Sequence, residues 1–305
     1  MRDPLTAFEH QLILSSFPKG SAAVTSMSFP GHNKRYPLRV TVTLPDGHEQ
    51  TVVLRQEDKP GGSELEARLL PVLERLGLPV SHVLAGPTCD PAHPDGPAKI
   101  VFSLLKGTDL LRTCWDATSS HLEVVANTTL DAIDRVHALT ETMLKDPVVE
   151  IIPRHSLADE AHAIKQKAGP WLGHELFATA LERVTPIVEA IEAPLVFSTG
   201  DYNPGNFLTD GHGVTGYVDF AWACFEDKFA GITRFWLNDW YPLNRVGIVE
   251  RYLYRHNVDR RTFSPRLVVR ALAMLQHDFA PGETKSDPTK DKTLHLLQHG
   301  LDGLK

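Results

Sequence analysis

The sequence has 305 residues, of which 42% are hydrophobic and 23% charged, as expected for a folded protein with one large domain or two unequal ones. Its formal net charge of -7 argues against a nucleic-acid-binding protein, because such proteins usually carry a basic excess that neutralises phosphates. The three cysteines form no CxxC pair, which argues against a disulfide framework and a zinc site. The sequence has no signal-peptide pattern, which argues against secretion, and no long apolar run, which argues against a membrane span. We therefore expect a cytoplasmic protein.

The first hundred residues have the pattern of a sheet. Residues 21–56 alternate apolar and polar side chains and are interrupted by turn clusters at 30–33 and 45–47, which predicts three successive antiparallel strands. The segment 87–97 is rich in Pro, Asp and Gly and predicts a loop between two more strands. We expect the second of these strands to run from Lys99 to Leu105.

A helix is predicted between the third and fourth strands. Ser63 begins a stretch in which apolar residues recur at helical intervals. Ser63 and Glu66 have the spacing of a capping box, so we expect the helix to begin at Ser63 and to run to about Gly77.

The rest of the chain is mainly helical. The helical period is found in the segments 122–139, 157–167, 175–191 and 245–304. A polar stretch at 281–292 interrupts the last of these segments. The change from strands to helices predicts an α+β fold with two lobes, residues 1–103 and residues 104–305. One island differs from its helical surroundings: it has a strand at 194–198, a polar loop at 200–206 and a hairpin at 207–220 that turns at 210–213.

Asp201, Asn206 and Asp219 lie in this island. The hairpin brings Asn206 and Asp219 together, and an amide oxygen with a carboxylate suits Mg²⁺ when phosphate oxygens and water complete the shell. Asp201 precedes Asn206 by the Asp-to-Asn spacing of a kinase catalytic loop, and Asp219-Phe220 takes the place of Asp-Phe-Gly. A tight turn or a strand end would explain each residue alone. Together, the three favour a phosphoryl-transfer site for Mg-ATP.

The run Gly200 to Leu208, GDYNPGNFL, resembles the His-Gly-Asp-x-x-x-x-Asn loop of the aminoglycoside phosphotransferase and choline kinase-like family. Val218-Asp219-Phe220 is similar to the metal-binding motif of that family. The resemblance implies a bilobal protein-kinase-like fold, with ATP held between a sheet-rich lobe and a larger helical lobe. It also implies that Asp201 is the catalytic base and that Asn206 and Asp219 bind Mg²⁺.

The resemblance extends to the phosphate-binding part of the first lobe. Gly31 and Asn33 fall in the turn that would cover the phosphates, although an ordinary hairpin turn explains them equally well. Arg55 takes the position of a phosphate-binding lysine, with a solvated strand-end arginine as the alternative. Glu66 resembles the helix glutamate that pairs with this basic residue, and Glu64 is the competing candidate on another helix face.

The strand that ends the first lobe is similar to the family's adenine-binding hinge. We expect an edge strand whose backbone at Ser103, Leu104 and Leu105 binds adenine, although a plain buried strand would have the same residues.

Two departures from the family leave the acceptor open. Thr199 replaces the histidine before Gly-Asp, and the acidic region after the metal motif is only partly kept, at 226–231. A group of aromatic residues lies near Glu226, Asp227 and Asp239 and could hold a cationic or partly apolar alcohol, but core packing explains most of them better. The aromatic residues are Trp222, Phe225, Phe235, Trp236, Trp240 and Tyr241.

The function predicted from the sequence is transfer of phosphate from ATP to a hydroxyl of a small acceptor, such as an aminoglycoside, another antibiotic, an amino alcohol or a sugar. A nucleotide-binding pseudokinase with an interaction role is the alternative, which Arg55 and the incomplete phosphate loop favour. A protein kinase ranks last because no Ala-Pro-Glu segment follows Asp219. The expected partner is therefore a small molecule, with neither nucleic acid nor membrane.

Overall fold

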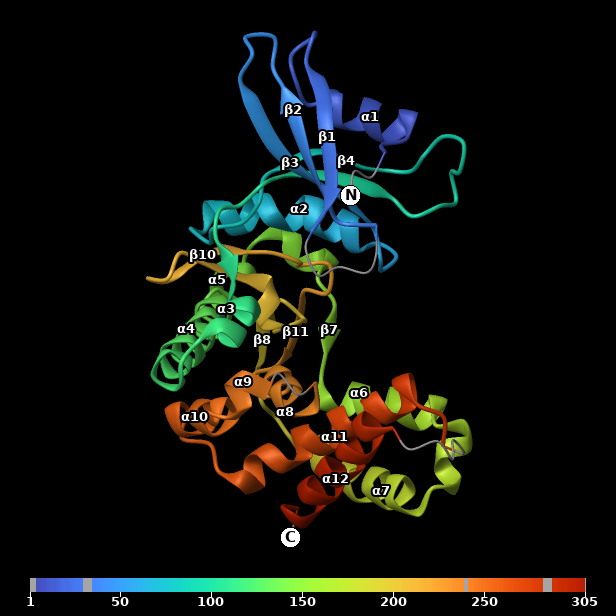
Figure 1. The fold of residues 1–305 in the computed structure, drawn as a ribbon. Helices are drawn as coiled ribbons and strands as arrows, with labels where there is room; N and C mark the ends of the chain where they lie inside the picture. Colours follow the sequence, from blue (N-terminus) through green and yellow to red (C-terminus); the bar gives the residue numbers. More distant parts are fainter. Residues whose placement is uncertain (1–3, 30–34, 239–240, 282–286, 305) are drawn as a thin grey trace. The chain divides into compact units, whose positions relative to one another are not determined.

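The computed structural model of the chain describes residues 4–29, 35–238, 241–281 and 287–304 (Figure 1). The chain divides into two compact units, and each is built from three segments. Met1–Asp109, Asp146–Ile151 and Gly205–Ala223 form the N-terminal unit. Leu110–Lys145, Ile152–Pro204 and Cys224–Lys305 form the C-terminal unit.

The N-terminal unit contains an antiparallel sheet of five strands in the order β1-β2-β3-β5-β4. The three successive strands predicted in the region 21–56 are confirmed. The prediction of an edge strand at residues 101–105 is wrong, because β4 pairs with the outer side of β5 and β5 ends at Ser103. The strands are β1 (Ala22–Ser28), β2 (Leu38–Thr43), β3 (Glu49–Gln56), β4 (Val83–Thr88) and β5 (Lys99–Ser103).

Strand β3 contacts a different helix on each of its two faces. Leu12 and Ile13 of α1 (Ala7–Leu14) join a buried cluster with Val52 and Leu54 of β3. Neighbouring residues of a strand point to opposite faces, so Arg55 leaves this cluster and contacts Glu66 of α2 (Gly62–Arg75) instead. Strand β3 thus carries a hydrophobic core on one face and a charged group on the other.

The start of α2 differs from the sequence-based prediction. The helix begins at Gly62, with Gly61 as a left-handed N-cap that makes no side-chain hydrogen bond. Ser63 therefore lies inside the first turn, and the Glu66 side chain is used by Arg55 and by the backbone of Phe220. The predicted capping box does not form because the carboxylate has a stronger, charged partner elsewhere.

The predicted hairpin belongs to the N-terminal unit. Strands β9 (Phe207–Thr209) and β10 (Val214–Tyr217) pair as expected, and β6 (Thr108–Asp109) extends them to a three-stranded sheet. The Tyr217 amide donates to the Pro79 carbonyl, at 2.8 Å, just after α2. The hairpin is therefore fixed to the segment that follows the helix carrying Glu66.

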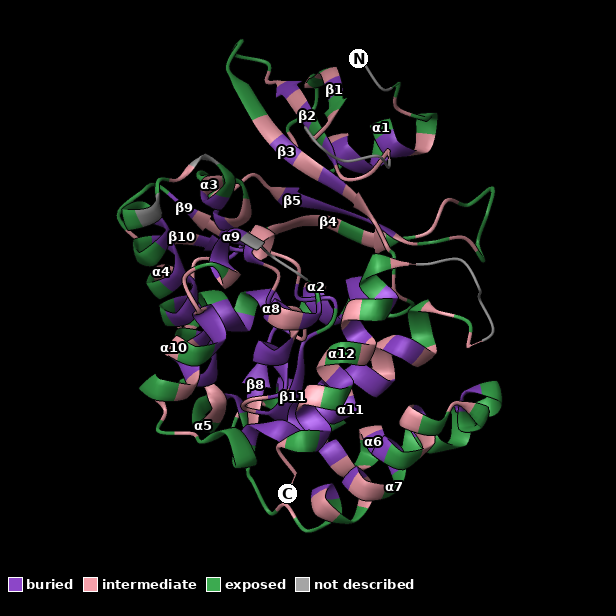
Figure 2. Cartoon of the chain, turned by 60° about the horizontal axis from the view of Figure 1, so that its bottom comes forward, coloured by how far each residue is buried: buried purple, intermediate pink, exposed green. Residues whose placement is uncertain are grey.

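The C-terminal unit is mainly helical around a small sheet, β7-β11-β8, made of Arg154–His155, Cys224–Asp227 and Leu195–Ser198. Every residue of β11 is buried, and Figure 2 shows this strand and β8 among the covering helices. The predicted helix at 157–167 is confirmed as α6. The helices are α3 (Leu110–Asp116), α4 (Ser119–His137), α5 (Thr140–Met143), α6 (Leu157–Lys167), α7 (Glu175–Glu189), α8 (Arg234–Leu237), α9 (Tyr241–Asn244), α10 (Ile248–Arg255), α11 (Arg260–Asp278) and α12 (Pro288–Asp302). In the described part of the chain, no helix is both long and apolar enough to span a membrane.

Candidate active site

Arg55 is the centre of a charged cluster in the N-terminal unit. Its NH1 group donates to Glu66 Oε1 at 3.0 Å and to Asp219 Oδ1 at 3.2 Å, and its NH2 group contacts Glu66 Oε2. Glu66 is 1% exposed, whereas Glu64 faces solvent. The pairing thus selects Glu66 over Glu64 and excludes the alternative of a solvated arginine at the strand end.

The cluster also fixes the backbone beside Asp219. Burial lowers the pKa of the Arg55 guanidinium, and the nearby charge of Asp219 opposes this shift. The group stays charged because arginine does not lose its proton in proteins. Glu66 Oε1 additionally accepts a hydrogen bond from the Phe220 amide at 2.9 Å. One buried carboxylate therefore connects strand β3, helix α2 and the segment that carries Asp219.

Asn206 and Asp219 lie at the open end of the hairpin. The Val218 amide donates to the Asn206 carbonyl at 3.0 Å, so the two ends of the hairpin meet there. Asp219 has a φ of 63°, in the left-handed region that residues other than glycine adopt at a cost in free energy. Its side chain is 33% exposed. No group of three or more His, Cys, Asp or Glu residues among those described is placed to hold a metal. An amide oxygen and one carboxylate nevertheless fit Mg²⁺, which usually keeps water and substrate phosphates in its shell.

Asp201 belongs to the C-terminal unit, because the division between the units falls between Pro204 and Gly205. Its Oδ1 accepts from the Asn203 amide at 3.2 Å and from Arg234 NH1 at 3.0 Å. Thr199 replaces the family histidine and holds the loop locally, since its hydroxyl donates to the Asp201 carbonyl at 2.9 Å. The carboxylate is thus oriented by its own loop and by an arginine from α8.

Arg234 was missed by the sequence analysis. It follows Asp201 by 33 residues and belongs to no motif. Only its position soon after the acidic stretch at 226–231 could have pointed to it, and that position does not determine where the side chain lies.

A buried network supports the loop that leads to Asp201. The Gly200 amide donates to Ser198 Oγ at 2.9 Å, and Ser198 Oγ donates to Glu226 Oε1 at 2.5 Å. Arg270 contacts Glu226 and, at 3.2 Å, Glu160. Glu226 of β11 is therefore used internally, to position the backbone of Gly200, the residue directly before Asp201.

Tyr202 packs the other side of this loop. A Cβ atom at Gly231 would lie 2.3 Å from the Tyr202 ring, so the packing of this ring requires glycine there. The Tyr202 hydroxyl is 2.6 Å from His137 Nε2, and the Tyr252 hydroxyl is 3.2 Å from His137 Nδ1. Burial lowers the pKa of His137 to about 3, so the imidazole is neutral.

The other residues predicted to bind the nucleotide lie in two places, the first turn of the N-terminal sheet and the end of β5. Gly31 and Asn33 lie outside the described residues. Ser103 ends β5, and both its amide and its hydroxyl are engaged by the backbone of His82, at 2.9 Å each. Leu104 and Leu105 follow the strand and are partly exposed. Adenine binding by this segment stays a prediction.

The aromatic residues considered for the acceptor are mostly structural. Phe225 and Phe235 are buried in the core, as the packing interpretation predicts, and Trp236 packs against Phe263. Trp222 is 47% exposed, in the N-terminal unit, and lies under Lys59. Asp239, Trp240 and the Tyr241 side chain lie outside what the structure describes.

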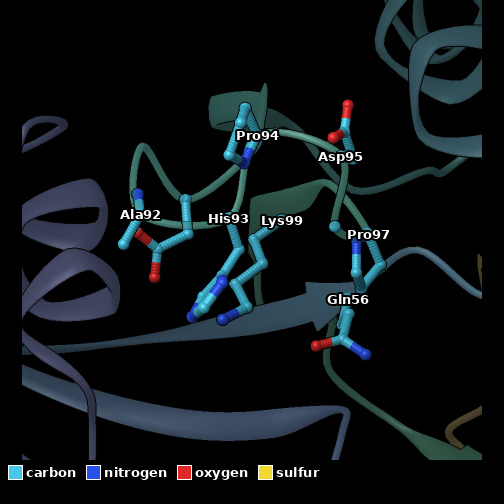
Figure 3. A pocket seen from close by; sticks show the side chains of 9 residues that line it. Gln56, Ala92, His93, Pro94, Asp95, Pro97 and Lys99 are labelled. Atoms are coloured by element: carbon cyan, nitrogen blue, oxygen red, sulfur yellow. The ribbon is translucent and has the colours of Figure 1, made fainter.

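A hollow of about 650 Å³ lies in the N-terminal unit, beneath the loop between β4 and β5 (Figure 3). Gln56, His93 and Lys99 are among its lining residues. Gln56 follows Arg55 in β3, so its side chain points to the opposite face of the sheet. This is the face of α1, where Lys99 pairs with Glu9 at 2.9 Å. The hollow is therefore separate from the Arg55 cluster.

Comparisons with known proteins agree with this fold. A thermostable variant of the aminoglycoside phosphotransferase APH(4)-Ia, in a complex with ADP and hygromycin B, superposes with a TM-score of 0.70 at 14% identity, over 97% of this chain and 98% of that chain. The GDP and kanamycin complex of APH(2")-IIIa gives a TM-score of 0.64 at 14% identity, over 97% and 98% of the two chains. No curated protein sequence matches the chain significantly.

The structural similarity shows a protein-kinase-like fold of the aminoglycoside phosphotransferase type, as the resemblance in the sequence predicted. Sequence comparison goes further. Residues 37–265 match the profile of the family described as the phosphotransferase enzyme family. Since this match spans most of the chain, from the second strand of the N-terminal sheet into α11, the protein belongs to the phosphotransferase enzyme family.

Proposed function

We propose that the protein transfers the γ-phosphate of Mg-ATP to a hydroxyl group of a small acceptor, of the kind found on aminoglycosides, other antibiotics, amino alcohols and sugars. The observation that carries the proposal is the Arg55 cluster. A guanidinium that can bind phosphate is held by a buried glutamate beside the carboxylate predicted to hold Mg²⁺. The proposal includes a cytoplasmic location, which suits three cysteines that form no disulfide.

The chain's residues have separate roles in this proposal. Arg55 would hold the α- and β-phosphates, while Asn206 and Asp219 would hold the metal ion. Bound Mg-ATP supplies the phosphoryl group and a metal ion that neutralises charge on the phosphates. Asp201 orients the acceptor hydroxyl and takes its proton as the oxygen forms a bond to the γ-phosphorus and the bond to ADP breaks.

Exchange of the proposed base tests the reaction. Asp201→Asn keeps the shape of the side chain but removes the proton acceptor, so we expect turnover to fall by about a hundredfold or more while the KM for ATP changes little. Release of ADP in the presence of Mg²⁺ and a panel of alcohols measures this.

Asp210→Asn is the matched control. Asp210 is an exposed turn residue of the hairpin, and its Oδ1 accepts from the His212 amide at 2.9 Å, which an asparagine oxygen can also do. This variant should turn over at the parent rate. Parent-rate turnover by Asp201→Asn would refute the assigned role of Asp201.

A nucleotide-binding pseudokinase is the second candidate. Arg55 in place of the usual lysine is the observation that favours it, because a guanidinium and an ammonium differ in geometry. A pseudokinase would bind ATP without forming ADP. Mg²⁺-dependent formation of ADP that is lost in Asp201→Asn would exclude this alternative.

A further inference from the structure

The charge beside Asp201 is positive. Arg234 of α8 donates from NH1 to Asp201 Oδ1 at 3.0 Å, and both side chains are partly exposed, at 30% and 26%. An acceptor hydroxyl that donates its proton to Asp201 must therefore approach within a few ångströms of a guanidinium.

This guanidinium has hydrogen-bonding capacity left over. Arginine has five N–H donors in a planar fork that suits two oxygens at once. Among the described residues, Asp201 is the sole hydrogen-bond acceptor of the Arg234 side chain, and the contact uses NH1 alone. The remaining donors are open to an oxygen of a ligand.

The neighbouring carboxylates do not offset this charge for a ligand. Asp227 makes a two-point pair with Arg266, at 3.0 and 2.7 Å, and both side chains are about 5% exposed or less. Glu226 and Glu160 share Arg270. Burial also raises the pKa of Glu160, against the charge of Arg270, which disfavours its ionised form. Glu226 and Asp227, two of the acidic residues that looked available for a cationic acceptor, are thus paired with arginines within the protein.

A polycationic acceptor would need an excess of carboxylates that are accessible to solvent, whereas the side chain that pairs with Asp201 is an arginine from α8. On the basis of the function proposed above, we propose that the acceptor carries an oxyanion, a carboxylate or a phosphate, close to the hydroxyl that is phosphorylated, and that Arg234 binds this oxyanion. Because Arg234 NH1 and Asp201 Oδ1 are 3.0 Å apart, the hydroxyl and the oxyanion belong on the same or neighbouring carbon atoms, as in a 2- or 3-hydroxy acid.

Matched small alcohols test this selectivity. Glycerate and glycerol differ in one carboxylate, glycerol 3-phosphate replaces it with a phosphate, and kanamycin is a polycation. Each is added to the full-length protein with Mg-ATP, and ADP release is followed, including the slow release to water. We expect glycerate or glycerol 3-phosphate to change the rate, by reaction or by exclusion of water, at concentrations where glycerol and kanamycin do not.

Variants of Arg234 connect this response to the proposed contact. Arg234→Gln should raise the concentration needed for the oxyanionic alcohol by about tenfold or more, whereas Arg234→Lys should retain part of the response because it keeps the charge. Arg251→Gln is the matched control, since Arg251 is also partly exposed, at 34%, and pairs with Glu123 at 3.2 Å. It should respond as the parent protein does.

The outcomes separate this proposal from the function on which it rests. It is overturned if kanamycin or glycerol acts at lower concentrations than the oxyanionic alcohols, if none of the oxyanionic alcohols changes ADP release, or if Arg234→Gln responds as the parent does. In each of these cases, the proposed phosphoryl transfer is still supported if ADP release depends on Mg²⁺ and is lost in Asp201→Asn. Absence of any such release refutes both.

Discussion

Arg55 holds a buried carboxylate and a partly exposed one at the same time. Glu66 has a 2% exposed side chain, so its charge is stable in the fold only because Arg55 offsets it. Asp219 sits on the solvent side of the same guanidinium, with 33% exposure. The arginine thus has a structural partner on one side and a partner suited to metal binding on the other.

This arrangement predicts a large effect of one substitution on stability. Arg55→Met leaves Glu66 buried without a cation, and we expect it to lower the free energy of unfolding by about 3–5 kcal/mol. Arg55→Lys keeps the charge and should cost much less. Chemical denaturation of the purified variants measures both.

A double variant separates loss of charge from loss of packing. Arg55→Met combined with Glu66→Gln removes the uncompensated carboxylate and should recover a large part of the lost stability. Arg39→Met, on an exposed position of β2, is the control and should change stability by about 0.5 kcal/mol or less. If Arg55→Met alone is as stable as this control, Glu66 does not depend on Arg55.

Residue-level features were predictable from the sequence to the extent that they follow from local spacing. Asp201, Asn206 and Asp219 stand in one short stretch, so their pattern is visible in the sequence. Glu66 and Glu64 could not be separated, because the choice depends on which face of α2 meets β3. Arg234 could not be found at all, since its contact with Asp201 is made by tertiary packing.

Helix α4 ends in a histidine that cannot easily accept a proton. His137 lies between the hydroxyls of Tyr202 and Tyr252, and burial, against the charge of Asp134, lowers its pKa to about 3. In the unfolded chain its pKa is about 6.5. Below that pH the unfolded chain takes up a proton that the folded protein does not, so stability falls as pH decreases from about 6.5 towards 3.

The slope of stability against pH tests this prediction. One such group contributes up to about 1.4 kcal/mol per pH unit within that window. His137→Gln should be less stable at neutral pH because it loses the fit between two tyrosines. Its stability should no longer show the fall between about pH 6.5 and 3 that the histidine causes. Denaturation at pH 7.5, 6 and 5 compares the two proteins. Equal slopes would mean that His137 titrates alike in both states.

Element boundaries were predicted best where the apolar period is undisturbed. Helix α6 occupies the predicted segment 157–167, because both its capping residue and its periodicity are local. Strand β11 was not predicted, since Glu226 and Asp227 look like exposed loop residues. In the structure both are buried, because arginines of α11 pair with them. The sequence shows the charges but not the partners that allow them to be buried.

At the scale of the whole molecule, the two compact units do not coincide with two continuous stretches of sequence. The N-terminal unit contains the hairpin, Gly205–Ala223, as well as the residues up to Asp109. The Phe220 amide contacts Glu66, and the Tyr217 amide contacts Pro79. A boundary at 103/104 therefore stays a prediction about functional lobes. A fragment cut there would lack the hairpin that completes the environment of Glu66.

Binding of Mg-ATP should stabilise the whole protein, because a ligand that binds only the folded state adds its binding free energy to stability. At about one hundred times its Kd, this adds about 2.7 kcal/mol, which corresponds to a rise in Tm of roughly 4 °C. A chelator should remove the Mg²⁺-dependent part of the rise. Thermal unfolding with ATP, with and without Mg²⁺, measures it.

Two variants decide whether this stabilisation passes through the proposed metal site. Asp219→Asn removes a carboxylate ligand, while asparagine tolerates the left-handed backbone found there, with φ of 63°. We therefore expect it to fold and to respond to ATP with little dependence on Mg²⁺. Asp201→Asn removes only the proton acceptor and should keep the full Mg²⁺-dependent rise. If Asp219→Asn keeps that rise as well, the metal ion is held by other residues, and the role proposed for Asp219 is wrong.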